Sequence, residues 1–205
     1  KRSMNQPDLL PQEFPSFAEE AFLSSGRMMF DAAALVKHET LCAEPKFRGF
    51  LRDRGDYVDF VPEAAGALSL WENPEPRHSY VIGADIAEGI KDRAYSAACV
   101  IDTGTLKQVA EWHGHCDPDQ FGVILAKLGA YYNQALMVPE ARPGPGGITL
   151  AKLLQLEYPR LWSRPLGSGA REPHQLLGWE TTSANRLDLL LTFAAEAVRD
   201  FKLVI

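Results

Sequence analysis

Two apolar runs decide the fold of this chain: Tyr80-Val81-Ile82-Gly83-Ala84-Asp85 and Ala135-Leu136-Met137-Val138-Pro139-Glu140. Each run is short enough to be a strand, and each ends in an acid. An isolated acid at a strand end is commonly a turn residue or a helix cap. If the two strands pair side by side, however, their acids meet at one edge of the sheet, which is what a divalent-metal site requires.

The segment between these runs predicts a meander followed by a crossover helix. Tyr95–Asp102 and Gln108–Cys116 are strand-like, and a Thr-Gly-Thr turn at 103–105 joins them, so these strands should pair antiparallel. Asp117–Tyr132 has apolar residues at helical spacing, with Asp117 as its cap. The helix then leads to Ala135–Pro139, whose continuous apolar run is typical of a strand buried on both faces.

The flanking segments complete an α/β domain organisation. Gly146–Leu156 and Ser183–Phe201 both have helical spacing. Residues 1–75 have scattered prolines and charges, with one short helix expected after Ser16, and a proline-rich connector follows at 71–76. We therefore expect an N-terminal extension at 1–75 and a core domain at 76–205.

Composition sets limits on the class of protein. The chain has 205 residues, of which 46% are hydrophobic, and a formal net charge of −6. It has no apolar run near the roughly 20 residues of a membrane-spanning helix, so we expect a soluble, intracellular protein without a membrane partner. The acidic balance disfavours strong independent binding to DNA, although a divalent-metal site must itself be acidic. Its three cysteines form no CxxC pair, which argues against a disulfide framework and a zinc site.

Asp85 and Glu140 are the leading candidates for metal ligands and catalytic residues. Carboxylates suit Mg²⁺ or Mn²⁺, and two such ions about 4 Å apart can activate water and stabilise the leaving oxygen of a phosphodiester. Asp92 follows Asp85 across a glycine-containing loop and is a candidate third acid. The alternative for Asp92 is a turn residue before the next strand.

Other polar residues have weaker patterns. Arg142 is close enough in sequence to Glu140 to contact a phosphate there, or it is an ordinary surface arginine. The segment 46–54 is either a basic contact patch or a solvated polar loop. His113 and His115 alternate and so share one strand face with Glu111, which suits a metal pair or a partly exposed strand face. The chain has no GxxxxGK[ST] phosphate loop.

Several short motifs follow one another along nearly the whole chain. They are Gln12-Glu13-Phe14-Pro15-Ser16 and Glu19-Glu20-Ala21-Phe22-Leu23-Ser24-Ser25-Gly26, then Gly83-Ala84-Asp85-Ile86-Ala87-Glu88-Gly89 with Asp92 and Tyr95-Ser96-Ala97, then Tyr132-Asn133 before Ala135–Glu140, and finally Gly178-Trp179-Glu180-Thr181-Thr182. In this order and spacing they resemble the C-terminal nuclease domain of the large terminase subunit of tailed bacteriophages. Residues 1–75 then resemble the segment that follows the packaging ATPase domain of that family.

The resemblance implies a ribonuclease H-like fold, with a central mixed sheet of three antiparallel strands and then parallel strands, flanked by helices. It implies a two-metal endonuclease that cuts concatemeric viral DNA, with Mg²⁺ or Mn²⁺ bound by Asp85, Glu140 and Asp92. Lys91, Arg93 and Arg142 would contact DNA. The implied partners are double-stranded DNA, the terminase ATPase domain, the portal and the small terminase subunit, in the host cytoplasm.

The chain departs from the family pattern at two places. Glu140 is followed by Ala-Arg-Pro-Gly-Pro-Gly rather than by a loop with asparagine and histidine. The family's last catalytic aspartate lies beyond the helix that matches Ser183–Phe201, and neither Asp188 nor Asp200 matches it. We therefore expect that acid beyond Ile205, with weak metal binding and little cleavage by this chain alone.

Two other classes of function stay open at this point. The first is a non-catalytic module with the same fold that docks on DNA or on the portal ring. The second is an ATP-binding domain of the actin and sugar-kinase type, which also opens with a hairpin of aspartate and glycine. That second class needs another phosphate-binding hairpin, and none is visible after Glu140.

Overall fold

The computed structural model describes residues 29–90, 94–164, 177–182 and 185–203. The chain divides into two compact units. The larger unit comprises Ala43–Thr182, and the smaller comprises Lys1–Cys42 together with Ser183–Ile205. Each unit is described by itself below. Within the described residues, no helix has both the length and the apolar character needed to cross a membrane.

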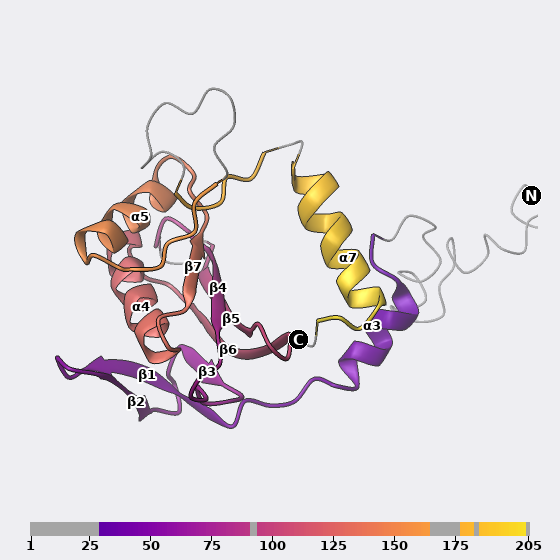
Figure 1. Ribbon diagram of the computed structural model, residues 1–205, viewed down its shortest axis with the longest axis horizontal. Helices are drawn as coiled ribbons and strands as arrows, with labels where there is room; N and C mark the ends of the chain where they lie inside the picture. Colours follow the sequence, from indigo (N-terminus) through magenta and orange to yellow (C-terminus); the bar gives the residue numbers. More distant parts are fainter. Residues whose placement is uncertain (1–28, 91–93, 165–176, 183–184, 204–205) are drawn as a thin grey trace, which may run out of the picture. The chain divides into compact units, whose positions relative to one another are not determined.

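A mixed seven-stranded sheet forms the centre of the larger unit, with the strand order β2-β1-β3-β6-β5-β4-β7 (Figure 1). The pairing of β4 with β7 is parallel, and the other pairings are antiparallel. The strands are β1 (Phe47–Asp53), β2 (Val58–Pro62), β3 (Leu68–Leu70), β4 (Tyr80–Asp85), β5 (Ser96–Asp102), β6 (Lys107–Gly114) and β7 (Leu136–Pro139).

The predicted meander, crossover helix and parallel strand are confirmed. Helix α4 (Pro118–Tyr131) connects β6 to β7, and α5 (Pro145–Gln155) follows β7. Asp117 occupies the N-cap position of α4 without a side-chain cap hydrogen bond, and Pro118 begins the helix with its preset backbone angle. Figure 1 shows α4 and α5 side by side on one face of the sheet.

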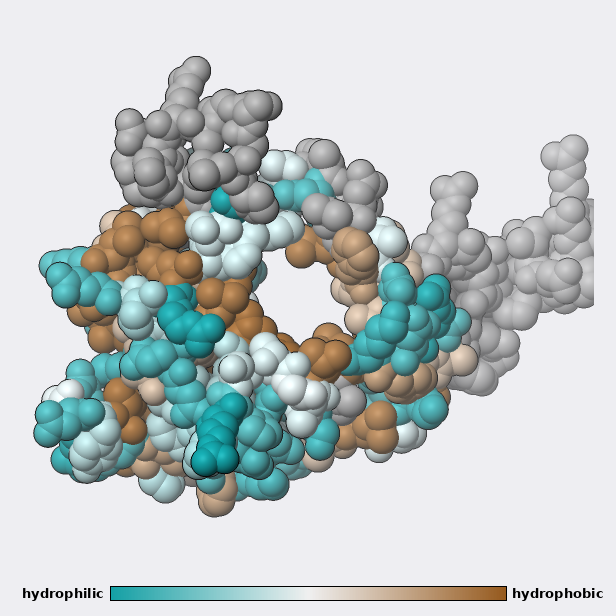
Figure 2. Space-filling view, viewed as in Figure 1, coloured by the Kyte–Doolittle hydropathy of each residue, from teal (hydrophilic) through white to brown (hydrophobic). Residues whose placement is uncertain are grey.

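Strands β1, β2 and β3 belong to the same sheet, although their residues fall within the segment 1–75 that the sequence separates from the core. The charged residues of β1 and β2 obscure the strand pattern in the sequence, because these charges form ion pairs only once the two strands have paired as a hairpin. Arg52 lies opposite Asp59 in the register, and its Nη2 is 3.0 Å from the Asp59 carboxylate. Arg54 contacts the same carboxylate at 3.1 Å. The basic segment 46–54 is thus partly neutralised, and Figure 2 shows mostly hydrophilic colour over this hairpin.

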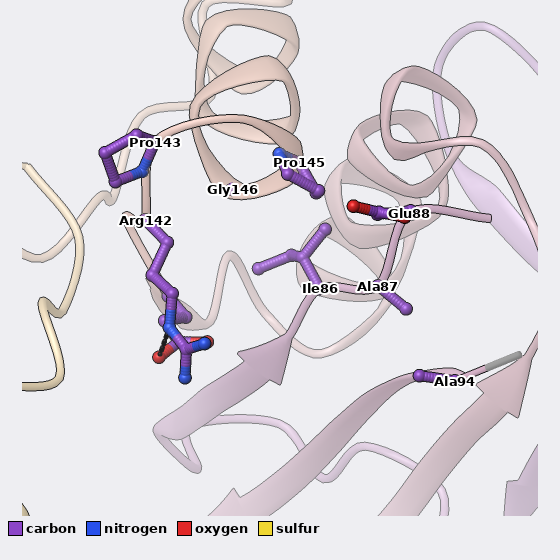
Figure 3. Close-up of a pocket in the computed structure, with 9 residues that line it drawn as sticks. Ile86, Ala87, Glu88, Ala94, Arg142, Pro143, Pro145 and Gly146 are labelled. Carbon is purple, nitrogen blue, oxygen red and sulfur yellow. Dashed lines mark hydrogen bonds and ion pairs between the residues drawn. The ribbon is translucent and has the colours of Figure 1, made fainter. Parts of the chain in front are cut away.

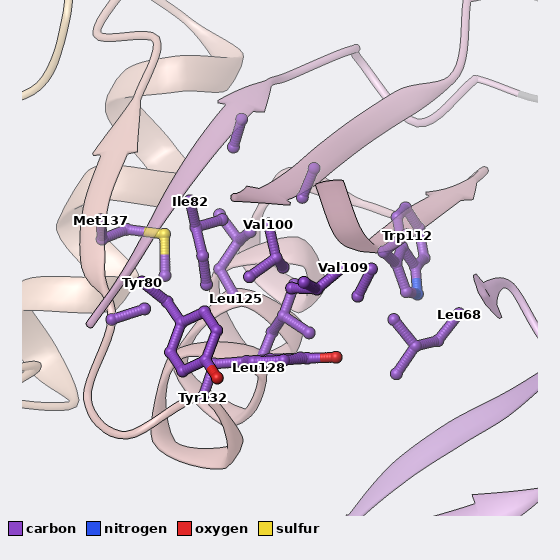
Figure 4. Close-up of a cluster of buried hydrophobic side chains, with 14 of the residues drawn as sticks. Leu68, Tyr80, Ile82, Val100, Val109, Trp112, Leu125, Leu128, Tyr132 and Met137 are labelled. Atoms are coloured by element: carbon purple, nitrogen blue, oxygen red, sulfur yellow. The ribbon is translucent and has the colours of Figure 1, made fainter. Parts of the chain in front are cut away.

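The main core lies between the sheet and α4. From β4, Tyr80, Ile82 and Ala84 are buried, whereas the residues between them point to the opposite face. Leu125 and Leu128 of α4 are fully buried against this face (Figure 4). Burying a side chain of this size stabilises the folded state by about 1.5–3 kcal/mol. Because α4 covers this face, the acids at the ends of β4 and β7 lie on the opposite face of the sheet.

The connector 71–76 is attached to the end of α4 by polar contacts. The Tyr132 hydroxyl donates to the Glu72 carbonyl oxygen at 2.7 Å. The Asn133 side-chain amide donates to the carbonyl oxygens of Glu75 and His78. These bonds hold the start of β4 beside the start of β7 and so support their common register.

The smaller unit is helical in the part that the structure describes. Helix α3 (Ala32–Glu39) begins after Asp31, whose carboxylate accepts from the Ala34 N–H at 2.7 Å. A π-helical turn (Arg186–Leu191) leads into α7 (Thr192–Arg199). Buried His38 lies 2.8 Å from the Val198 carbonyl oxygen through Nε2 and joins the two helices. The predicted helix at Ser183–Phe201 is confirmed for its described residues, whereas the predicted Ser16 cap lies outside them.

The three cysteines form no disulfide with one another. Burial raises the pKa of the Cys99 thiol to about 12 and that of Cys116 to about 11. Both thiols are therefore protonated at neutral pH, as expected for packed cysteines.

An ion pair between buried Asp102 and partly exposed His78 closes the turn after β5. The Asp102 carboxylate lies 2.6 Å from His78 Nδ1 and also accepts from the N–H groups of Gly104 and Thr105. Burial alone would raise the pKa of Asp102, but these hydrogen bonds outweigh it and lower that pKa. The hydrogen bond with Asp102 raises the pKa of His78.

We predict that Asp102→Asn lowers the free energy of unfolding by about 1–2 kcal/mol at pH 5.5 and by less at pH 8.5. The stabilisation by Asp102 is complete above its unfolded pKa of about 3.9 and is lost as the pH falls through its lower folded value. The stabilisation by His78 is complete below its unfolded pKa of about 6.5 and is lost as the pH rises through its higher folded value. Urea unfolding at the two pH values measures the difference.

The matched control is Asp53→Asn. Asp53 accepts from the Gly55 N–H in an exposed turn, so its replacement should have a small effect that does not depend on pH over this range. An equal loss of stability from Asp102→Asn at both pH values would contradict the assigned ion pair.

Candidate metal centre

The parallel pairing of β4 and β7 brings Asp85 and Glu140 together. Ala84 lies opposite Pro139 in the register, so the next residue of each strand is an acid. The Glu140 N–H donates to the Ala84 carbonyl oxygen at 2.9 Å, which extends the ladder to the acids themselves. Because alternate residues of both strands face the core, both carboxylates lie on the opposite face of the sheet.

The two carboxyl groups are close enough to affect each other's charge. The pKa of Asp85 is raised, first by partial desolvation and then by a hydrogen bond and charge repulsion from Glu140. Arg142 and the N–H of Ile86 act in the opposite direction. A raised pKa means that negative charge is disfavoured at this place, so a bound cation would relieve the repulsion.

Arg142 forms an ion pair with Glu140. Its Nε lies 2.8 Å from Glu140 Oε1. The Glu140 side chain is 13% exposed, whereas that of Arg142 is 63% exposed. The guanidinium therefore extends from a largely buried acid toward solvent, where it can also meet a ligand.

Glu140 is held in place from two sides by segments distant in sequence. Trp179 donates its N–H to the Pro139 carbonyl oxygen at 2.8 Å and accepts from the Ala141 N–H at 2.6 Å. On the other side, Gly146 in the first turn of α5 lies so close that a Cβ there would stand 2.3 Å from the Glu140 carbonyl oxygen. Only glycine fits this approach without a shift of the backbone.

A pocket of about 430 Å³ opens beside the acids (Figure 3). Its lining takes in Glu140 and Arg142, the three residues after Asp85, and the loop that leads into α5; the residues are Ile86, Ala87, Glu88, Ala94, Glu140, Arg142, Pro143, Pro145 and Gly146. The pocket thus lies at the carboxyl ends of β4 and β7, where ligands commonly bind in α/β sheets.

The other predicted site residues are placed as follows. Lys91, Asp92 and Arg93 lie outside the described residues. Asp200 belongs to the smaller unit and pairs with Arg199 at 3.0 Å. Within the described part of the chain, no group of three His, Cys, Asp or Glu side chains is arranged to hold a metal ion.

Two contributors to this site did not emerge as candidates from the sequence. Glu88 lines the pocket, and its position in the loop directly after Asp85 was the available signal. Trp179 supports Glu140 through main-chain hydrogen bonds, which the spacing of side chains in the sequence does not predict.

The chemistry of the donor set fits a hard divalent cation. Asp85 and Glu140 offer carboxylate oxygens, which Mg²⁺ and Mn²⁺ prefer, and Mg²⁺ commonly uses only one or two carboxylates and keeps several waters. Two adjacent acids with one raised pKa are also common at functional sites.

Comparison with known proteins shows the fold. No protein-family model matches the chain, and no curated protein matches it significantly. Among solved structures, the magnesium-bound large terminase nuclease from thermophilic phage G20c is similar, with a TM-score of 0.51 and 16% identity over 77% of this chain and 67% of that one. The zinc-bound form of that nuclease has a TM-score of 0.52 and 16% identity, over 83% and 79% of the two chains.

A second phage provides another similar structure. The large terminase nuclease domain of Thermus phage P74-26 has a TM-score of 0.50 and 18% identity, over 69% of this chain and 63% of that one. The chain has the fold of the large terminase nucleases. The predicted ribonuclease H-like fold with its mixed sheet is thereby confirmed.

We predict opposite effects for alanine at two adjacent glycines in the first turn of α5. Gly146→Ala should lower the free energy of unfolding by about 1–3 kcal/mol, because its Cβ would press against the Glu140 backbone. Gly147→Ala should raise it by up to about 1 kcal/mol, because a Cβ there has its nearest neighbour at 3.8 Å and alanine is the better helix former. Urea unfolding measures both.

Calorimetric titration with Mn²⁺ provides a second measurement for the same pair. Gly146→Ala should also weaken Mn²⁺ binding, because it displaces Glu140, whereas Gly147→Ala should leave binding unchanged. Equal stability and equal Mn²⁺ affinity in the two variants would show that Gly146 does not position the acid.

Proposed function

We propose that this protein is a metal-dependent endonuclease that cuts concatemeric viral DNA during genome packaging. The observation that carries the proposal is the adjacent pair Asp85 and Glu140 at the carboxyl ends of β4 and β7. The fold shared with the phage terminase nucleases supports it. An acid pair alone is not specific to nucleases, and the fold alone does not determine function. The proposal therefore rests on both together.

Asp85 and Glu140 would hold Mg²⁺ or Mn²⁺, with Asp92 as a third acid and two ions as the full set. Divalent cations at such sites activate water and stabilise the leaving oxygen of a phosphodiester. The similar nuclease from phage G20c has crystal structures with magnesium, cobalt or zinc bound, which supports a divalent cation here. The contribution of the chain is to hold the two carboxylates on neighbouring strands, so that little rearrangement is needed when a cation binds.

Arg142 would contact the DNA backbone beside the acids. It lies at the mouth of the pocket, and its ion pair with Glu140 uses Nε. A guanidinium has several donors in a fixed plane, so Arg142 can keep this bond and donate to a phosphate oxygen as well. Lys91 and Arg93 are proposed as further DNA contacts from the sequence alone.

The wider setting is part of the same proposal. The substrate would be double-stranded DNA, and the partners would be a terminase ATPase domain, the portal and the small terminase subunit, in the host cytoplasm. The chain covers between 63% and 79% of the terminase nuclease chains described above. The activity of a complete packaging motor is therefore a proposal for this chain.

A non-catalytic docking module on DNA or on the portal is the second candidate. The observation that favours it is that the described residues bring together two carboxylates at this site, with no third His, Cys, Asp or Glu to complete a metal-binding group. Such a module would keep the fold and bind DNA without cutting it.

We predict that the chain nicks supercoiled plasmid slowly in the presence of excess Mn²⁺, in line with the weak cleavage expected from its sequence, and that Asp85→Asn and Glu140→Gln each reduce this cleavage to the level seen without protein. Loss of one ligand changes both the affinity for the cation and its orientation. Gel analysis of plasmid cleavage measures the rate, and calorimetry measures Mn²⁺ binding by the same variants. Asp119→Asn is the control, because this acid pairs with Lys152 on the helical layer.

The outcomes separate the two candidates. Cleavage that survives in Asp85→Asn would refute the acid pair as the catalytic site. DNA binding without cleavage by any variant, with no Mn²⁺ binding that depends on Asp85, would favour the docking module.

We predict that Arg142→Ala weakens DNA binding and makes it less dependent on salt. Loss of one phosphate contact should reduce the slope of log K against log salt concentration by about 0.9 for duplex DNA. Fluorescence anisotropy at several salt concentrations, with Ca²⁺ in place of Mn²⁺, measures this slope. Arg160→Ala is the matched control, because exposed Arg160 contacts the Gln134 carbonyl oxygen at the opposite end of β7. An unchanged slope in Arg142→Ala would exclude a phosphate contact by this residue.

A further inference from the structure

Three exposed rings gather where β5 begins and β6 ends, and we define them as the ring cluster: Tyr95, His113 and His115. The centroid of the Tyr95 ring is 4.6 Å from that of His113 and 3.9 Å from that of His115, with interplanar angles of 26° and 31°. Tyr95 is 51% exposed, and both histidines are exposed as well. The sequence predicts that the two histidines share a strand face, and their contact with Tyr95 is new.

The ring cluster lies on the same face of the sheet as the acids. Asp85 is opposite Ala97 in the register, and Ala97 is opposite His113 on the next strand. These residues therefore form one cross-strand row, and none of them belongs to the buried core. Two strand spacings separate Asp85 from His113, which is about 10 Å.

Small residues lie between the acids and the ring cluster. Ala97 is the residue of the row between Asp85 and His113. On the same face, a Cβ placed on Gly83 would meet nothing within 4 Å. The sheet face between the carboxylates and the rings thus has small residues at these two positions. Ala94, which directly precedes Tyr95, lines the pocket that also includes Glu140.

The polar atoms of the ring cluster are available to a ligand. In the described part of the chain, no hydrogen bond or ion pair engages the Tyr95 hydroxyl or the ring nitrogens of His113 and His115. His38 and His78, in contrast, each have a hydrogen-bond partner. The ring cluster therefore offers a hydroxyl and imidazole nitrogens that have no hydrogen-bond partner within the described residues.

We infer that the ring cluster is a second contact for the DNA strand, one that holds the sugar–phosphate backbone within about three base steps of the phosphate to be cut. This inference rests on the proposed function. About 10 Å corresponds to about three rises of 3.4 Å along a duplex. Tyrosine hydroxyls are common phosphate and sugar donors, and an imidazole N–H donates in the same way. The ring cluster is a positioning surface, since it lies too far from the acids to touch the reacting atoms.

A metal site at the two histidines explains the arrangement less well. No third His, Cys, Asp or Glu joins the two histidines to form a metal-binding group in the described residues. A DNA backbone would accept hydrogen bonds from the Tyr95 hydroxyl and the imidazole N–H groups, and it continues directly from the proposed active site.

The test measures DNA binding without cleavage. A fluorescein-labelled 20-base-pair duplex is titrated with the full chain in the Asp85→Asn background, with Ca²⁺ present, and anisotropy gives the Kd. We expect Tyr95→Ala and the double variant His113→Ala/His115→Ala each to raise the Kd about five- to tenfold, and Tyr95→Phe to raise it by a similar factor because it removes the hydroxyl donor. Tyr57→Ala is the matched control, since Tyr57 is 63% exposed beside β2, the opposite outer strand of the sheet.

Hydroxyl-radical footprinting on a longer duplex adds a measurement of position. The wild-type ring cluster should protect nucleotides next to the cut, and Tyr95→Ala should lose protection there alone. Urea unfolding of each variant confirms that it is folded. An unchanged Kd and an unchanged footprint in the folded Tyr95 and double-histidine variants would overturn the inference.

Failure of this inference is distinguishable from failure of the proposed function. If the wild type cuts DNA in an Asp85-dependent manner but the ring variants bind DNA normally, the nuclease stands and the ring contact is refuted. If no variant cuts DNA but the ring variants still bind it more weakly than the Tyr57 control, the ring contact stands and the nuclease is refuted.

Discussion

The parallel pairing of β4 with β7 is the constraint on which the rest of the structure depends. Main-chain hydrogen bonds fix the register, and the register places Asp85 beside Glu140 whatever their mutual repulsion. Desolvation is the main cause of the raised pKa of Asp85, the hydrogen bond with Glu140 and this repulsion add to it, and Arg142 partly offsets it. The stability of the sheet, supplied mainly by apolar packing on its other face, thus maintains an arrangement of charges that the two side chains alone would avoid.

The sequence was sufficient for the parts of the fold that have their own apolar periodicity. The strands from Tyr80 to Pro139 and helix α4 each bury a continuous face, so their pattern is local. The hairpin of β1 and β2 is different, because Arg52 and Asp59 read as loop charges until pairing places them opposite each other. The π-helical turn before α7 likewise has no periodicity that distinguishes it from an α-helix.

At the site, too, features that depend on local sequence were predictable, whereas contacts between distant segments were not. Asp85 and Glu140 could be paired from strand order alone, because carboxyl ends of parallel neighbours meet at one edge. The support from Trp179 and Gly146 could not be predicted, since it consists of main-chain bonds and a close approach between distant segments. Tyr95 belongs to one of the motifs, but its contact with both histidines depends on the pairing of β5 with β6, which brings Ser96 opposite Gly114.

The two outer strands of the sheet also bear on how copies of the chain behave toward each other. Unpaired strand edges are sites of intermolecular β-aggregation. Beside β2, the ion pairs of Asp59 with Arg52 and Arg54 would have to lose their hydration before another strand could pair with this edge. At β7 the edge is occupied by short bridges from Leu161 and Trp179. Charge at one edge and the bridges from the same chain at the other therefore disfavour the addition of a strand from another copy of the protein.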